Sequence, residues 1–151
     1  MKRSLETAWL SLVLLTTFCR VWWWLQRGGL ESTVDRATIT LMARRATQEV
    51  NAAEAAKQLR RAVREDELIS WWLVKFHIHA ICLYRALVML RRLSQFPFVN
   101  RIELVLGVMR HPQAGVVGHA WLVMNECEFR QNPAVWTEFR TLYRLLREAP
   151  T

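Results

Sequence analysis

Residues 82–124 read CLYRALVMLRRLSQFPFVNRIELVLGVMRHPQAGVVGHAWLVM, and their pattern changes midway along the segment. Up to residue 93 the apolar side chains recur at helical spacing, and Pro97 prevents the helix from continuing. Residues 102–109 and 116–124 are apolar, rich in strand-forming residues and bounded by turn-forming residues, which predicts two strands. A helix followed by a short antiparallel sheet is therefore the expected centre of the fold.

The sequence before this centre predicts further helices. One is expected over about residues 4–26, where Gly28-Gly29 ends it, and the next over residues 33–65, with a break near Asn51. Residues 66–80 are strongly apolar and predict a buried helix.

After the two strands, residues 126–130 predict a short third strand, and residues 134–147 predict an amphipathic C-terminal helix. The whole chain, 1–151, is expected to form one domain of the α+β class. Its helical N-terminal region, 1–65, should pack on a small antiparallel sheet carried by residues 66–151.

The composition is that of a folded, basic protein. Among 151 residues, 52% are hydrophobic and eight are tryptophan, so an intrinsically disordered chain is excluded. The net charge of +8 favours an anionic partner of some kind. Four basic residues recur at helical spacing and form one basic stripe, which is either a solvated face or a docking surface for a peptide or partner: Lys57, Arg60, Arg61 and Arg64.

The cysteines and histidines do not match a disulfide framework or a metal site. Cys19, Cys82 and Cys127 are odd in number and widely spaced, which indicates a reducing, cytoplasmic location. None of them forms a C-x-x-C pair that the histidines could complete, so no metal and no cofactor are expected. The histidines are His77, His79, His111 and His119.

The N-terminus superficially resembles a secretory signal, because basic residues precede the apolar run Ala8–Phe18. Arg20 interrupts the run, three tryptophans follow at residues 22–24, and the run is shorter than a membrane span requires. We expect a helix that packs in the core, on a partner or on a membrane surface.

Cys82 and His119 are the candidate catalytic pair. A cysteine in the first turn of a helix is stabilised as the thiolate by the helix N–H groups and dipole. His119, beside Gly118 and Ala120 on a predicted strand, could accept the thiol proton and later protonate a leaving amine. The alternatives are a buried structural cysteine and a core histidine, and the lack of Gly or Pro in residues 66–81 argues against a helix start at Cys82.

These residues resemble the leader peptidases of lasso peptide biosynthesis, which are members of the transglutaminase-like superfamily with a papain-type triad. The resemblance covers about residues 80–132. Its motifs are Cys82-Leu83-x-Arg85-Ala86-Leu87, Leu90-Arg91-Arg92-Leu93, Gly107-Val108-x-Arg110 with Pro112, and His119-Ala120-Trp121.

The resemblance implies Cys82 as nucleophile, His119 as base and a third residue twelve positions later. That position is Gln131, where the family has an acidic residue. Glutamine can accept the imidazole N–H but supplies no negative charge. Asn132 and Glu128 are the alternatives, and Cys127 is expected to be a bystander.

The resemblance also implies partners. The N-terminal region is too short and too helical for a leader-recognition module. A separate leader-recognition protein is therefore expected to deliver the precursor peptide, and a macrolactam-forming cyclase to receive the product. Two other functions remain open from the residues, namely transglutaminase-like acyl transfer and a non-catalytic helical adaptor in which Cys82 and His119 lie far apart. No nucleic-acid-binding motif is recognisable.

Overall fold

The computed structural model describes residues 2–43, 51–78, 80–129 and 139–148. The described residues form helices followed by an antiparallel sheet, which confirms the mixed α+β architecture. The elements are α1 (Lys2–Met42), α2 (Ala52–Lys75), α3 (Ile81–Leu93), β1 (Arg101–His111), β2 (Gly115–Met124), β3 (Cys127–Glu128) and β4 (Arg140–Glu148).

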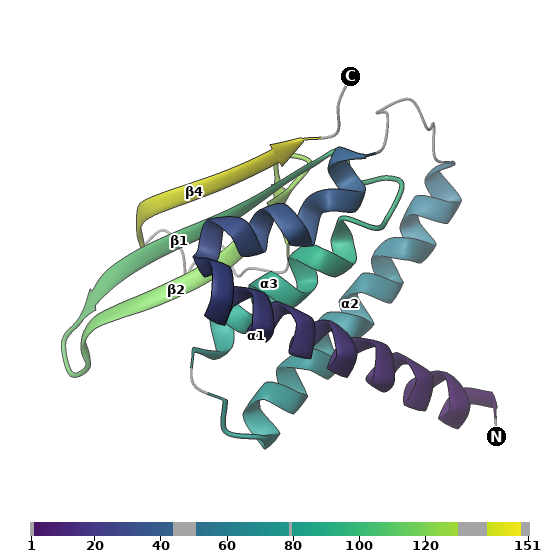
Figure 1. Ribbon diagram of the computed structural model, residues 1–151, viewed down its shortest axis with the longest axis horizontal. Coiled ribbons are helices and arrows are strands. Elements are labelled where there is room, and N and C mark those ends of the chain that lie inside the picture. The colour runs from purple at the N-terminus through teal and green to yellow at the C-terminus, as the bar shows by residue number, and fades with distance from the viewer. Residues whose placement is uncertain (1, 44–50, 79, 130–138, 149–151) are drawn as a thin grey trace.

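The sheet has the strand order β3-β2-β1-β4 (Figure 1). Leu104 of β1 lies opposite Leu122 of β2 on one side and Leu145 of β4 on the other. These three leucines are buried and share one face, because directly paired residues point to the same side of a sheet. The sheet therefore has an apolar face on which the helices pack.

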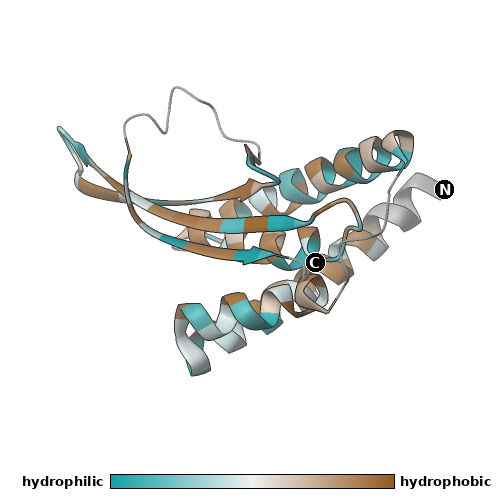
Figure 2. Ribbon diagram, turned by 90° about the horizontal axis from the view of Figure 1, so that it is seen from above, coloured by the Kyte–Doolittle hydropathy of each residue, from teal (hydrophilic) through white to brown (hydrophobic). Residues whose placement is uncertain are grey.

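The central helix is α3, which lies between α1 and α2 and contacts β1 and β2 (Figure 1). Its fully buried residues include Leu87, Leu90 and Leu93. In Figure 2 hydrophobic residues follow the strands and helices where they meet, whereas the far tip of the β1–β2 hairpin is hydrophilic. The helix that carries Cys82 is thus held on three sides by apolar packing.

The expected breaks in the helical region are present, with one difference in length. Gly29 has φ 70° and ψ −174° and kinks α1, but the helix resumes at once and reaches Met42. Only glycine reaches such backbone angles at little cost. Asn51 caps α2, its side chain accepting a hydrogen bond from the N–H of Ala53.

The prediction of a separate buried helix over residues 66–80 is wrong. Helix α2 runs through Glu65 and Asp66 without interruption and ends at Lys75. Its last turns are half exposed, with Trp71 59% accessible. The prediction fails because helical spacing alone does not show how wide the covered face of a helix is.

The prediction of a C-terminal helix over residues 134–147 is also wrong. Its described part, Arg140–Glu148, is strand β4, which pairs antiparallel with the free edge of β1. Leu145 is buried on the helix-facing side, and Arg147 donates hydrogen bonds to Asp35 of α1. The edge of β1 supplies hydrogen-bond partners that outweigh the local helical pattern.

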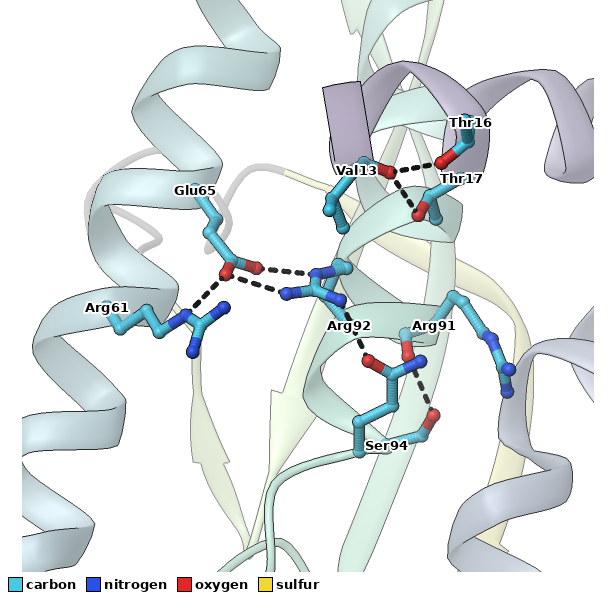
Figure 3. Close-up of polar contacts among 9 residues, drawn as sticks. Val13, Thr16, Thr17, Arg61, Glu65, Arg91, Arg92 and Ser94 are labelled. Carbon is cyan, nitrogen blue, oxygen red and sulfur yellow. Dashed lines mark hydrogen bonds and ion pairs between the residues drawn. The ribbon is translucent and has the colours of Figure 1, made fainter. Parts of the chain in front are cut away.

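A buried ion pair joins α2 to α3 (Figure 3). Glu65, fully buried, accepts hydrogen bonds from Arg92 Nε at 2.7 Å and Arg92 Nη2 at 2.8 Å. Arg61 Nε donates to the same carboxylate at 3.0 Å, and Arg92 also donates to Gln95. Every oxygen of the buried carboxylate therefore has a charged donor, as a buried charge requires.

Candidate active site

The junction between α2 and α3 uses non-glycine residues in left-handed conformation. His77 has φ 52° and Ala80 has φ 56° and ψ 41°. Such angles cost an alanine roughly 1–2 kcal/mol, which the surrounding packing must offset. This strain explains how a helix can start at Ile81 without the Gly or Pro that the sequence lacks, and strained backbone of this kind is concentrated at functional sites.

Cys82 lies in the first turn of α3. The N–H groups of Leu83 and Tyr84 both bond to the carbonyl of Ala80, at 3.0 and 3.2 Å. Within the part of the chain that the structure describes, no side-chain hydrogen bond caps this end of the helix, and the N–H groups of Ile81 and Cys82 precede the first bond within the helix. The positive end of the helix dipole thus lies at the thiol.

His119 lies on β2, opposite Gly107 of β1. In the described residues β3 pairs with β2 at Val123 and Met124, so β2 forms the sheet edge at His119. This edge meets the start of α3, and the thiol of Cys82 and the ring of His119 are hydrogen-bonded. The structure therefore brings the two candidate residues together, and the separation that a non-catalytic adaptor would show is not observed.

The environment of Cys82 favours the thiolate. The hydrogen bond with His119 is the largest cause that lowers the pKa of Cys82, and burial opposes it. The backbone N–H groups of Ala120 and Leu83 and the charge of His119 lower the pKa further. The net result is a Cys82 pKa below the ordinary value, which increases the fraction of nucleophilic thiolate near neutral pH.

Aromatic rings hold the imidazole of His119. The Trp121 ring stacks beside it, with centroids 5.9 Å apart, and the Phe139 ring lies 5.2 Å away. A Cβ atom at Gly107 would come within 2.8 Å of the Trp121 ring, so this glycine leaves the space that the tryptophan fills. The sequence alone did not indicate Phe139, because it lies twenty residues beyond His119 in the chain.

A small pocket, open to solvent, adjoins Cys82. Its walls come from α2, α3, β2 and the residue after β3, and most are apolar. One side carries an ion pair, in which Arg85 Nε and Nη2 donate to the two oxygens of Asp66 at 2.7 and 2.6 Å. The lining residues are Asp66, Cys82, Arg85, Ala86, Met89, Ala120, Trp121, Leu122 and Phe129.

The Asp66–Arg85 pair also belongs to the electrostatics of the site. Asp66 is 2% exposed, and its carboxylate raises the pKa of Arg85, which therefore stays protonated. Burial opposes this increase in the pKa of Arg85, and the negative charge of Cys82 adds a smaller increase. Asp66, nineteen residues before Arg85, was not among the sequence-predicted site residues because nothing local marks it as a partner.

Of the three candidates for the residue that orients His119, the structure describes only Glu128. Gln131 and Asn132 lie outside the described residues. Glu128 is on β3 opposite Val123, four residues from His119 along β2, which corresponds to roughly 13 Å. Burial raises the pKa of Glu128, and the positive charge of Arg144 lowers it. At that distance along the strand Glu128 is poorly placed to orient the imidazole.

The remaining sequence candidates lie away from the pair or at the surface. Cys127 is exposed on β3 and Cys19 is exposed on α1. His111 is at the hairpin tip, where its Nδ1 accepts from the N–H groups of Gln113 and Ala114. His79 lies outside the described residues, and in the described part of the chain no three His, Cys, Asp or Glu side chains gather as metal ligands.

The basic stripe is present as an exposed face of α2. Lys57 forms a solvent-exposed ion pair with Glu54 at 3.5 Å, and Arg61 is engaged with the buried Glu65. Arg60 and Arg64 are exposed. The basic surface therefore exists, although Lys57 pairs with Glu54 and Arg61 with the buried Glu65.

A family model described as "Transglutaminase-like superfamily" matches residues 13–144, most of the chain. No curated protein and no solved structure matches the sequence.

Proposed function

The chain belongs to the transglutaminase-like superfamily, and on this basis we propose that it is a cysteine peptidase that removes the leader from a ribosomally made lasso peptide precursor. The superfamily includes cysteine peptidases and acyl transferases. The observation that carries the proposal is the hydrogen bond between Cys82, in the first turn of α3, and His119 on the adjacent strand. The resemblance of residues 80–132 to lasso leader peptidases supports the substrate.

In the proposed reaction the Cys82 thiolate attacks the scissile carbonyl carbon. As the C–N bond breaks, His119 gives its proton to the leaving amine. A water molecule then attacks the thioester and gives its proton to His119. The C–S bond breaks, which releases the new carboxylic acid and restores the thiolate–imidazolium pair, and the acid then loses its proton to solvent. The N–H groups at the start of α3 are suitable donors to the oxyanion in both steps.

The third position is proposed as Gln131, with Asn132 as the alternative and Glu128 as the least well placed. A glutamine carbonyl can accept the imidazole N–H and fix the ring orientation. The rings of Trp121 and Phe139 already restrict how His119 can turn. We therefore expect Gln131 to contribute less to the rate than a carboxylate does in an acid-bearing triad.

Cleavage of a lasso precursor in the presence of its leader-recognition protein tests the assignment. The wild-type protein should release leader and core, whereas Cys82→Ala and His119→Ala should not. Cys127→Ser removes an exposed thiol of the same chain and serves as the matched control, which should cleave at the wild-type rate. Cleavage by Cys82→Ala at the wild-type rate would overturn the proposal.

Mass spectrometry of the same products separates hydrolysis from acyl transfer, since both begin with the same thioester. Hydrolysis gives two fragments whose masses together equal the precursor plus one water. Acyl transfer instead joins the acyl fragment to an added amine. We expect the hydrolytic products.

The basic stripe is our proposal for the surface that receives the leader or its recognition protein. Its test replaces Lys57, Arg60 and Arg64 by glutamine and leaves Arg61 in place, because Arg61 holds Glu65. We expect partner-dependent cleavage to slow and the pH dependence of Cys82 reactivity to stay the same. Unchanged partner-dependent cleavage would remove the stripe from the proposal.

A further inference from the structure

Helix α1 is apolar on two opposite sides. Leu14 and Val21 are fully buried in the core shared with α3. On the other side a row of large apolar side chains is exposed to solvent. We call this row the α1 ridge: Trp9, Leu12, Leu15, Trp22 and Trp23.

The α1 ridge is long and projects outward. Its first three members are three residues apart, Trp22 follows Leu15 after seven residues, or about two turns, and Trp23 lies next to Trp22. From Trp9 to Trp23 the helix rises roughly 21 Å. Trp9 is 65% exposed, and Trp22 and Trp23 are each 47% exposed. Figure 1 shows the N-terminal part of α1 reaching past α2 toward the end marked N. A helix that is apolar all round is normally covered on every side, so this ridge indicates a further apolar partner.

The charges along the ridge define the chemistry of that partner. Arg20 and Arg27 are exposed beside the tryptophans, and the guanidinium carbon of Arg27 lies 3.8 Å from the centre of the Trp23 ring. The sequence contains no acidic residue between Glu6 and Glu31. The partner surface must therefore offer apolar contact and negative charge together, over the length of a straight helix.

We propose that the α1 ridge docks the protein on an anionic lipid bilayer surface, with α1 lying parallel to the membrane plane. Tryptophan rings partition to the boundary between headgroups and acyl chains, and arginines beside them pair with lipid phosphates. The described pocket is lined by residues of α2, α3 and β2 and by Phe129, and no residue of α1 is among them. Docking therefore goes beyond the proposed peptidase reaction and leaves its site open.

The helix lies on the membrane instead of crossing it. By length and composition alone, the segment Ala8–Met42 could span a bilayer, and only 17% of its most apolar window is buried. However, Leu14 and Val21 are core residues, and Arg91 of α3 donates hydrogen bonds to Ala37 and Thr40 of the same helix. Spanning would pull these residues out of the fold, whereas surface docking uses the face that the fold leaves exposed.

Sedimentation with lipid vesicles tests the proposal on the full-length protein. Vesicles of phosphatidylcholine alone are compared with vesicles of equal parts phosphatidylcholine and phosphatidylglycerol. We expect clear binding to the anionic vesicles that weakens as salt is raised. Arg20→Gln with Arg27→Gln should weaken this binding about twenty-five-fold, since each cation near such a surface contributes about a factor of five.

Tryptophan variants test the ridge itself. Trp9→Ala, Trp22→Ala and Trp23→Ala together should weaken vesicle binding by about tenfold or more. Trp71→Ala is the matched control, because Trp71 on α2 is equally exposed but outside the ridge, and it should bind as the wild type does. The alkylation rate of Cys82 should stay unchanged in each variant, which shows that the fold and the catalytic pair are intact.

Three results would overturn the proposal. The first is no binding to anionic vesicles at any lipid concentration used. The second is an equal loss of binding in the Trp71 control. The third is a wild-type dimer in solution that the ridge variants abolish while vesicle binding is absent, because the ridge would then meet a second copy of the chain.

Discussion

Cys82 obtains its reactivity from residues that are far apart in the sequence. Its thiol is hydrogen-bonded to His119, and the N–H groups of Ala120 and Leu83 lower its pKa as well. Because folding lowers its pKa, the Cys82 thiol reacts as the thiolate at pH values where a free cysteine thiol is still protonated. The measurable consequence is a shift in the pH dependence of alkylation.

We expect the alkylation rate of Cys82 to rise with pH around a midpoint below the ordinary cysteine value of about 8.5. Iodoacetamide labelling is followed by mass spectrometry in a Cys19→Ser, Cys127→Ser background, so that one thiol reports. His119→Ala removes the largest cause of the shift, so the midpoint should move up and the rate at pH 7 should fall several-fold. An unchanged midpoint in His119→Ala would contradict the hydrogen-bonded pair.

Gly107 leaves the space in which the Trp121 ring packs beside His119. Gly107→Ala would place a Cβ within 2.8 Å of the Trp121 ring and 3.3 Å of the Arg140 carbonyl. We expect a loss of about 1–3 kcal/mol in the free energy of unfolding, because overpacking displaces a buried ring, and slower alkylation of Cys82. Gly118→Ala is the matched control, since an added Cβ there meets nothing within 4 Å. Equal stability of both variants in denaturant unfolding would show that Trp121 yields without cost.

The sequence indicates the two residues that the structure brings together but not the residues around them. Cys82 and His119 stand in recognisable motifs, and both motifs are short and continuous. Asp66 and Phe139 reach the site from α2 and from the segment before β4. Such partners are set by packing between distant segments, which local spacing does not encode.

At the scale of elements, two leucines of β4 test whether residues 140–148 form a strand or a helix. In a C-terminal helix Leu142 and Leu146 would share the buried face, whereas in β4 Leu145 is 5% exposed and Leu142 is 63% exposed. Leu145→Ala should therefore cost about 2–4 kcal/mol of unfolding free energy, and Leu142→Ala less than about 0.5 kcal/mol. Chemical denaturation measures both, and the reverse order would favour the helix.

The helix was predicted there because leucines at residues 142 and 146 have helical spacing. The same segment contains Thr141 and Tyr143, which are common in strands, and the choice depends on a partner edge. Pairing of β4 with β1 over Arg101–Val108 supplies that edge. In contrast, β1 and β2 were predicted correctly because they are joined by a short hairpin and are strongly apolar.

The Glu65–Arg92 ion pair connects α2 to α3 and is buried, so removing one partner should strongly destabilise the fold. Glu65→Gln leaves the guanidinium of Arg92, itself 8% exposed, without its counter-ion. We expect a loss of about 3–5 kcal/mol in unfolding free energy. Arg61→Gln is the control, because the Arg61 side chain is 57% exposed, and its loss should cost less than about 1 kcal/mol. Similar losses of unfolding free energy in the two variants would show that the buried Glu65–Arg92 pair contributes no more to stability than the exposed Arg61 contact does.

At the scale of the whole molecule, the N-terminal helices share one core with the elements that carry Cys82 and His119. The residues that α1 contributes to it are fully buried and include Leu14, Val21, Val34 and Leu41. Helix α2 crosses the expected boundary at residue 65 without a break. The helix that carries Cys82 is consequently positioned by residues from both halves of the chain.

A fragment consisting of residues 66–151 should therefore not fold, although it contains Cys82, His119 and every strand of the described sheet. It lacks Glu65, so Arg92 loses its buried counter-ion, and it lacks the α1 side chains that cover α3. We expect no cooperative thermal transition by circular dichroism and a Cys82 alkylation midpoint like that of a free thiol. The full chain should show one transition at which helix and sheet signals are lost together. A cooperative transition in the fragment would mean that the sheet and α3 position Cys82 and His119 without α1.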